Sequence, residues 1–296
     1  MAAGSLAAAY WFVPDVRLRV LVGLGRNHQC PLERALESPR HQREIVAAKD
    51  RLLAATREVR TEAGLKLYAT PQGEYWIPYR EKTSLYAFAW NMAEMDTRFY
   101  GTGPRTVQKG DVVLDCGANV GVFTRLALND GAAKVIAIEP MPDNIRALER
   151  TFAPEIAAGR VVVYGKGVWD REDFLPMLID PTNSAADSFV IEQKGAQAST
   201  VKLPLTTIDQ LVADLKLERV DFIKMDIEGA EVKALEGGKG TIAKFRPRMA
   251  LSTYHTPTDP EEIPRRVAAA KSGYRIECGP CQEIPGGVRP DVMYFY

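Results

Sequence analysis

A glycine-rich turn is the first feature of the sequence that could do chemistry. An apolar run ends in Asp115 and leads into the motif G-A-N-V-G, which contains Gly117, Asn119 and Gly121. Glycines at these spacings allow a ligand to approach the backbone closely, and asparagine tolerates the left-handed conformation and can cap a helix. A turn of this kind between a strand and a helix is typical of nucleotide binding.

The ligand of this turn can be narrowed by the residues around it. Glu139 closes the next apolar run, 24 residues after Asp115, where its carboxylate could accept both hydroxyls of a ribose. A dinucleotide fingerprint needs a third glycine at the position of Val122, and Asp115 would repel a pyrophosphate. S-adenosylmethionine, which carries an ammonium group and a sulfonium, fits better. The alternative is a turn that only packs a helix on a sheet.

A second cluster of charged residues lies in the segment K-M-D-I-E-G-A-E, with Lys224, Asp226, Glu228 and Glu231. Carboxylates so close together must be paired, ligated or hydrated. Asp226 and Glu228 could hold magnesium or calcium. Alternatively, Asp226 orients an acceptor hydroxyl while Glu228 binds backbone amides at a helix N-terminus. For Glu231 we expect only the favourable interaction of an acid with the helix dipole.

His255 follows another apolar run, in M-A-L-S-T-Y-H-T-P. A neutral imidazole at the carboxyl edge of a sheet could act as general base toward a hydroxyl. The alternative is a surface histidine or one that only forms structural hydrogen bonds.

Four blocks of the chain together resemble the FkbM-type S-adenosylmethionine-dependent methyltransferases. The segment K-M-D-I-E-G-A-E is the most specific of these matches. The resemblance implies O-methylation of a sugar, polyketide or similar metabolite. The blocks are 110–124, 136–149, 203–211 and 220–238.

The resemblance also implies roles for individual residues. Asp115 would contact the amino-acid part of the cofactor, and Glu139 would contact its ribose. The stretch that includes Val168 would contact its adenine. The glycine turn would lie between these contacts. The implied catalytic residues are His255, Asp226, Lys224 and Glu228.

Strand and helix patterns alternate after residue 110, and the elements that they indicate would position the site residues. These patterns predict a Rossmann-like α/β domain with a mostly parallel seven-stranded sheet. The last two strands have no helix between them and should form an antiparallel C-terminal hairpin. The predicted strands are 111–116, 134–139, 160–164, 220–225, 248–253, 274–277 and 291–296, and the predicted helices are 120–129, 143–152, 206–216, 230–243 and 260–272.

The chain divides into two parts at a Gly/Pro-rich stretch. Residues 1–105 are expected to form an N-terminal extension, and residues 106–296 the methyltransferase domain. The extension should contain a helix, a β-hairpin and a second helix, and should act as a cap over the acceptor site, a homodimer contact, or both. These elements are expected at 39–61, 65–78 and 83–99.

Composition excludes several classes of protein. The 296 residues carry 38 Lys+Arg and 38 Asp+Glu, which argues against a nucleic-acid partner. The apolar run 6–13 is too short to span a membrane and lacks the positive flank of a signal peptide. We therefore expect no transmembrane segment.

The cysteines indicate the compartment. Four of them, at 30, 116, 278 and 281, are too few and too unevenly spaced for a disulfide framework, so a reducing, cytoplasmic location is expected. The pair Cys278 and Cys281 has C-x-x-C spacing, which we interpret as a structural turn rather than a zinc or redox site.

Two other functions remain open. Methylation of RNA or of an amine is less favoured, because the N/D-P-P-aromatic signature of such enzymes is replaced here by residues 224–227. A non-catalytic cofactor-binding subunit is the second alternative.

Overall fold

The computed structural model describes residues 13–79, 83–178, 189–190 and 200–296. A seven-stranded sheet forms its centre, in the order β12-β15-β11-β10-β4-β5-β6. β15 runs antiparallel to its two neighbours, and the other neighbouring pairs are parallel, which confirms the predicted sheet. The strands are β4 (Val112–Cys116), β5 (Lys134–Ile138), β6 (Val161–Tyr164), β10 (Phe222–Met225), β11 (Arg248–Ser252), β12 (Ile276–Cys278) and β15 (Val292–Phe295).

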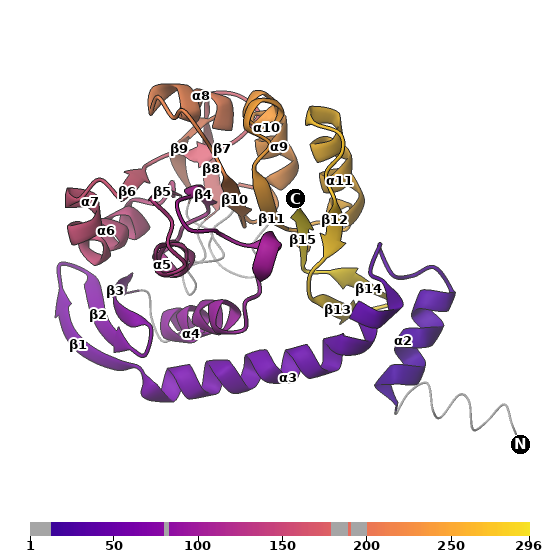
Figure 1. The fold of residues 1–296 in the computed structure, drawn as a ribbon. Helices are drawn as coiled ribbons and strands as arrows, with labels where there is room; N and C mark the ends of the chain where they lie inside the picture. Colours follow the sequence, from indigo (N-terminus) through magenta and orange to yellow (C-terminus); the bar gives the residue numbers. More distant parts are fainter. Residues whose placement is uncertain (1–12, 80–82, 179–188, 191–199) are drawn as a thin grey trace, which may run out of the picture.

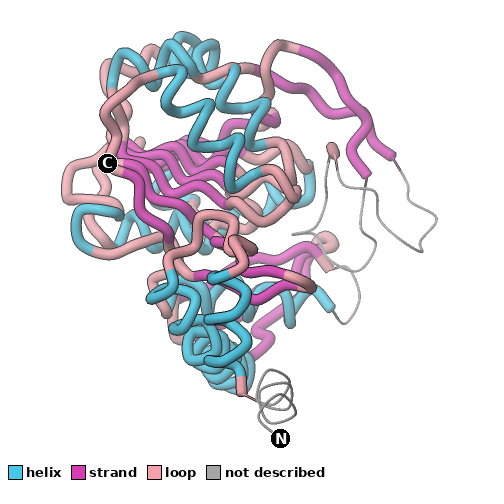
Figure 2. The backbone as a smooth tube through the Cα atoms, turned by 90° about the vertical axis from the view of Figure 1, so that its right-hand side faces the viewer, coloured by secondary structure: helices cyan, strands magenta, loops and turns pink. Residues whose placement is uncertain are grey.

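Each face of the sheet has its own hydrophobic core, because successive strand residues point to opposite faces. In β4, Val113 packs with α4, α5 and α6, whereas Leu114 and Cys116 pack with α8, α9, α10 and α11. Figures 1 and 2 show the sheet between these helical layers. The helices are α4 (Thr83–Asp96), α5 (Val122–Asn129), α6 (Pro142–Thr151), α7 (Ala153–Ala157), α8 (Ile208–Asp214), α9 (Glu231–Glu236), α10 (Lys239–Phe245) and α11 (Asp259–Ala270).

Local sequence signals set several helix ends. The hydroxyl of Thr207 caps α8 by accepting a hydrogen bond from the amide of Gln210 at 2.9 Å. Pro142 occupies the first turn of α6, where its missing N–H costs nothing. The single helix predicted at 230–243 is wrong, because Gly237 and Gly238 divide it into α9 and α10.

The C-terminal hairpin contains more structure than expected. The segment between β12 and β15, for which no strand was expected, holds β13 (Cys281–Ile284) and β14 (Gly287–Pro290), which pair with each other. A second small sheet was also missed. It has the order β7-β9-β8 and consists of β7 (Gly167–Val168), β8 (Asp173–Leu178) and β9 (Thr200–Thr206).

The N-terminal segment wraps along one side of the domain (Figure 1). Its first long helix runs from Leu32 to Ala55, so the prediction of 39–61 is wrong at both ends. Pro39 lies inside this helix, and residues 57–62 form an edge strand whose side chains are all exposed. The predicted hairpin and second helix are confirmed. The elements are α2 (Pro14–Gly23), α3 (Leu32–Ala55), β1 (Arg57–Glu62), β2 (Leu65–Thr70), β3 (Gly73–Pro78) and α4.

The extension and the sheet share one hydrophobic core. Ile45 of α3, Leu65 of β2 and Met92 of α4 are buried in the same cluster as Val113 and Phe222 of the sheet. The extension is therefore packed against the domain and does not form a detached unit.

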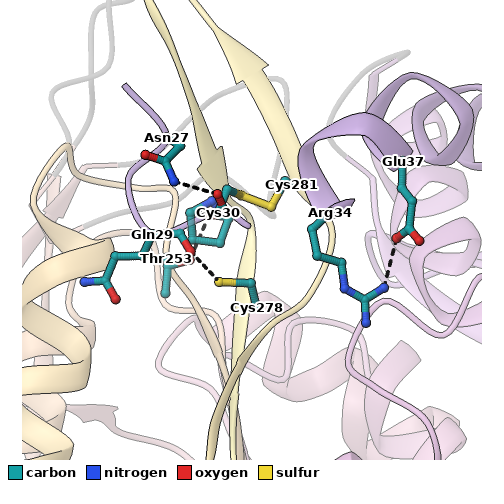
Figure 3. The surroundings of a disulfide bond; sticks show 9 residues. Asn27, Gln29, Cys30, Arg34, Glu37, Thr253, Cys278 and Cys281 are labelled. Carbon is teal, nitrogen blue, oxygen red and sulfur yellow. Dashed lines mark hydrogen bonds and ion pairs between the residues drawn. A yellow bond between two sulfur atoms is a disulfide. The ribbon is translucent and has the colours of Figure 1, made fainter. Parts of the chain in front are cut away.

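A disulfide joins the extension to the C-terminal hairpin. Cys30, just before α3, is bonded to Cys281 of β13 across a Cα–Cα distance of 6.4 Å (Figure 3). The expectation of a chain without disulfides is wrong, because the two cysteines are 251 residues apart in sequence and meet only in the fold. Cys278 ends β12 and Cys281 begins β13, so the C-x-x-C motif does form a turn. Its second cysteine also serves the disulfide.

Among the described helices, none is both long and apolar enough to cross a membrane. The apolar run 6–13 lies outside the described residues except for Val13.

Candidate active site

The first cavity lies where α4 of the extension faces the carboxyl ends of β4 and β10. It has a volume of about 320 Å³. Of the predicted catalytic residues, Lys224, Asp226 and Glu228 line it together with the glycine turn. Its described lining residues are Tyr86, Ala87, Trp90, Asn91, Glu94, Met95, Tyr100, Gly117, Ala118, Asn119, Val122, Phe123, Lys224, Asp226, Glu228 and Tyr254.

A second cavity lies beside the first, at the carboxyl ends of β4, β5 and β7. Of the predicted cofactor-binding residues, Gly117, Asn119, Glu139 and Val168 line it, with apolar Ile138, Met177 and Phe189 among their neighbours. Gly117, Asn119, Asp226 and Glu228 line both cavities. An extended ligand could therefore lie in the second cavity and reach into the first.

The glycine turn adopts the conformation that its sequence predicts. Gly117, Asn119 and Gly121 have φ angles of +79°, +49° and +90°. Packing gives a further reason for the two glycines. A Cβ on Gly117 would lie 1.9 Å from the carbonyl oxygen of Asp226, and one on Gly121 would lie 2.2 Å from the ring of Phe152. Gly121 is the N-cap of α5 and is not among the described lining residues of either cavity.

Glu139 is buried, and its carboxylate is held by several donors. One oxygen accepts a hydrogen bond from the amide of Asn119 at 2.9 Å. The other accepts from the amide of Met141 at 3.0 Å and from the side chain of Asn144 at 3.2 Å. These bonds fix the carboxylate at the wall of the second cavity, where its interaction with ribose stays a prediction.

Asp115 is fully buried behind the first cavity. One carboxylate oxygen accepts a hydrogen bond from the hydroxyl of Thr124 at 2.7 Å, and the other lies 3.3 Å from Nζ of Lys224. Lys224 also donates to the carbonyl of Gly117 at 2.9 Å. Asp115 is absent from the described lining of both cavities, so the structure gives it a role in holding Lys224 and the turn. Its direct contact with a cofactor stays a prediction.

Asp226 is fixed at the junction of the two cavities by two tyrosines. It accepts hydrogen bonds from the hydroxyl of Tyr100 at 2.8 Å and from that of Tyr254 at 3.3 Å. Burial alone would raise the pKa of Asp226, but the positive charges of Lys224 and His255 lower it below its usual value. The two hydrogen bonds therefore hold the carboxylate of Asp226 in place, and the neighbouring positive charges favour its ionised form.

His255 is the predicted site residue whose role the structure changes most. Its side chain is 2% exposed and is absent from the described lining of both cavities. Nδ1 lies 3.0 Å from Glu231, and Nε2 lies 3.4 Å from Asp226 and 3.6 Å from Glu228. Burial alone would lower the pKa of His255, but the acids, Glu231 first, raise it to about 11. An imidazole with this raised pKa keeps its proton at neutral pH, so the geometry favours a charged ring held between acids. The role of His255 as general base stays a prediction.

The same geometry argues against the predicted metal role of the acidic segment. Asp226, Glu231 and His255 each offer a ligand atom within 4.8 Å of the others. However, the two nitrogens of one ring face different carboxylates, with Glu231 on one side and Asp226 and Glu228 on the other. This arrangement suits a protonated imidazole clamped between acids. A metal ion would have to bind the carboxylates that the imidazole already contacts, so the charged ring and a metal ion compete for the same groups.

Sequence reasoning assigned no role to several polar residues that line the first cavity, among them Glu94, Tyr100 and Tyr254. Glu94 and Tyr100 come from the N-terminal extension, outside the nucleotide-binding pattern. Tyr254 directly precedes His255, and its hydroxyl reaches Asp226. For Glu94, the available signal was an acidic residue within the mostly apolar stretch 85–95 of α4.

Comparison with known proteins adds a family model. The model described as the methyltransferase FkbM domain matches residues 115–276, which is more than half of the chain. The match covers the glycine turn, the acidic segment, Glu139 and His255.

Individual proteins show more distant similarity. The hexuronic acid methyltransferase AglP of Haloferax volcanii is 24% identical over 57% of this chain and 66% of its own length. The 2-O-methyltransferase NoeI of Sinorhizobium fredii is 27% identical over 46% of this chain and 60% of its own length. The crystal structure of methyltransferase FkbM from Methylobacillus flagellatus superimposes with a TM-score of 0.51 at 18% identity, over 88% of this chain and 60% of that one. This chain thus spans less than two thirds of each of these proteins, and the structural likeness concerns the fold alone.

Proposed function

Since the chain belongs to the FkbM methyltransferase family, we propose that it is an S-adenosylmethionine-dependent O-methyltransferase whose acceptor is a hydroxyl of a small molecule or glycan. The observation that carries this proposal is the pair of cavities that meet at Gly117, Asn119, Asp226 and Glu228. Two relatives are named for methylation of a hexuronic acid and for 2-O-methylation, which supports an oxygen acceptor.

The residues of the second cavity fit S-adenosylmethionine. The fixed carboxylate of Glu139 would bind the ribose hydroxyls, and Val168 and Met177 give an apolar wall for the adenine. The ionised carboxylate of Asp226 lies where the second cavity opens into the first, and it favours a positively charged group there. When bound, this cofactor supplies a methyl group whose bond to sulfur breaks, leaving the electron pair on sulfur, as the bond to the acceptor oxygen forms.

The chain's own contribution is alignment and exclusion of water. Tyr100 and Tyr254 hold Asp226 in one position, and Lys224 holds the glycine turn through the carbonyl of Gly117. Transfer between two bound groups depends mainly on such positioning. In this proposal α4 of residues 1–105 covers the acceptor site, because Tyr86, Trp90 and neighbouring side chains of α4 line the first cavity.

Replacing Glu139 by glutamine tests the cofactor site. Glutamine keeps the size of the side chain but replaces one acceptor oxygen with an amide group that cannot accept the hydrogen bonds made by Glu139. We expect S-adenosylmethionine to bind about 10- to 100-fold more weakly, because charge-assisted hydrogen bonds contribute about 1.5–3 kcal/mol. Isothermal titration calorimetry measures this change.

Glu149→Gln is the matched control, since Glu149 is exposed on α6 and is absent from the described lining of both cavities. It should bind the cofactor as the wild type does. Equal affinity in the Glu139→Gln and Glu149→Gln variants would remove Glu139 from the cofactor site.

A further inference from the structure

The extension places a carboxylate in the first cavity that the sequence motifs do not include. Glu94 lies in the last turn of α4 and lines the first cavity together with Lys224 and Asp226. It is separated by more than 120 residues from the acidic segment, so only the fold brings them together.

The other charged groups of this cavity are already committed to partners. Asp226 is bonded to two tyrosines and faces His255. Glu228 lies 3.6 Å from the same imidazole, and Lys224 is paired with buried Asp115. Glu94 makes no ion pair with any described residue, and its carboxylate is hydrogen-bonded to Trp90 of the same helix.

The surroundings of Glu94 favour uptake of a proton by its carboxylate. Burial, followed by the negative charges of Asp226 and Asp291, raises the pKa of Glu94 well above its usual value, and Lys224 acts in the opposite direction. Tyr100 and Tyr254 line the same cavity, and the charge of Glu94 helps to raise the pKa of both phenols. A base is most effective when its pKa lies near the working pH, whereas a carboxylate held ionised by cations, as Asp226 is, accepts a proton poorly.

We propose that Glu94 is a catalytic residue that accepts the proton of the acceptor hydroxyl as the oxygen gains the methyl group. This inference rests on the proposed function. The proton leaves the hydroxyl oxygen and is held on a carboxylate oxygen of Glu94 until it exchanges with solvent. The extension then completes the active site as well as covering it.

Glu94→Gln tests the position of this carboxylate without needing an acceptor. The sulfonium of S-adenosylmethionine should favour ionised Glu94, whereas S-adenosylhomocysteine, which has no such charge, should not. We therefore expect the affinity ratio of the two ligands, measured by calorimetry from pH 6 to pH 8, to rise with pH by roughly 3- to 10-fold in the wild type. The rise should be lost in Glu94→Gln.

Asp96→Asn is the matched control on the same helix, because Asp96 pairs with Arg51 outside the cavity. It should keep the wild-type dependence on pH. An equal rise in Glu94→Gln would overturn the inference.

Activity gives the second readout once an acceptor is known. With that acceptor, Glu94→Gln should lower kcat about 10²- to 10⁴-fold and lose the rise of kcat with pH, while a thermal melt shows that it is folded. A kcat within about threefold of the wild type would also overturn the inference. A wild-type protein that binds neither ligand would instead refute the proposed function, so the two failures are distinguishable.

Discussion

Replacing His255 by alanine is expected to lower the free energy of unfolding by about 3–5 kcal/mol, because it removes one member of a buried ionic cluster. Glu231 is fully buried and lies 3.0 Å from Nδ1, and it would lose its positive partner. Asp226 and Glu228 would lose the charge that faces them at Nε2. Urea unfolding followed by fluorescence measures the change.

His28→Ala is the control, since His28 also lies 3.4 Å from a glutamate but both side chains are about 40% exposed. We expect little loss of stability there, because solvent screens an exposed pair. If His255→Ala unfolds like the wild type but no longer transfers a methyl group, His255 does not stabilise the acidic cluster and acts as the general base instead.

The stability supplied by His255 should also depend on pH. Its pKa is raised on folding, from the usual 6.5 to about 11. The contribution is then fully present below about pH 6.5 and is lost as the pH rises toward 11. The stability difference between wild type and His255→Ala should therefore shrink as the pH rises through this window.

Replacing Gly117 by alanine is expected to abolish cofactor binding, with a loss of at least about 100-fold in affinity, and to lower stability by more than about 3 kcal/mol. Its Cβ would lie 1.9 Å from the carbonyl oxygen of Asp226, and neither backbone can move without separating β4 from β10. The φ of +79° adds strain for any residue with a side chain. Titration with S-adenosylmethionine and thermal unfolding report the two effects.

Gly159→Ala measures the cost of backbone strain in the absence of a steric clash. Gly159 has a φ of +70°, and a Cβ there would meet nothing within 4 Å. It should cost about 1–2 kcal/mol and leave cofactor binding unchanged. If Gly117→Ala and Gly159→Ala lose the same stability and the same cofactor affinity, close packing of the turn against β10 is not the reason for glycine at position 117.

The fold was predictable where local pattern and burial coincide. All seven strands of the central sheet were found from their apolar runs, because both faces of this sheet are covered by helices. β1 was missed, since none of its side chains is buried and it carries no alternating pattern. The strands β7, β8 and β9 were missed because a long intervening segment separates β8 from β9.

The site was predictable only within the motifs. Glu139, Lys224, Asp226 and Glu228 line the cavities, as their positions at the carboxyl ends of two predicted strands indicated. Glu94 could not be predicted, because its approach to Asp226 depends on how α4 packs. The surroundings of His255 could not be predicted, because three acids meet around its ring only in the folded chain, and these acids favour its charged form.

Transfer of an isotope-labelled methyl group from S-adenosylmethionine is the most direct test of the central claim. The wild-type protein would be incubated with an extract of glycans and secondary metabolites, with and without EDTA, and the products analysed by mass spectrometry and NMR. We predict a labelled methyl ether, formed at the same rate in both samples. Label on nitrogen or carbon, or cofactor binding without any labelled product, would contradict it.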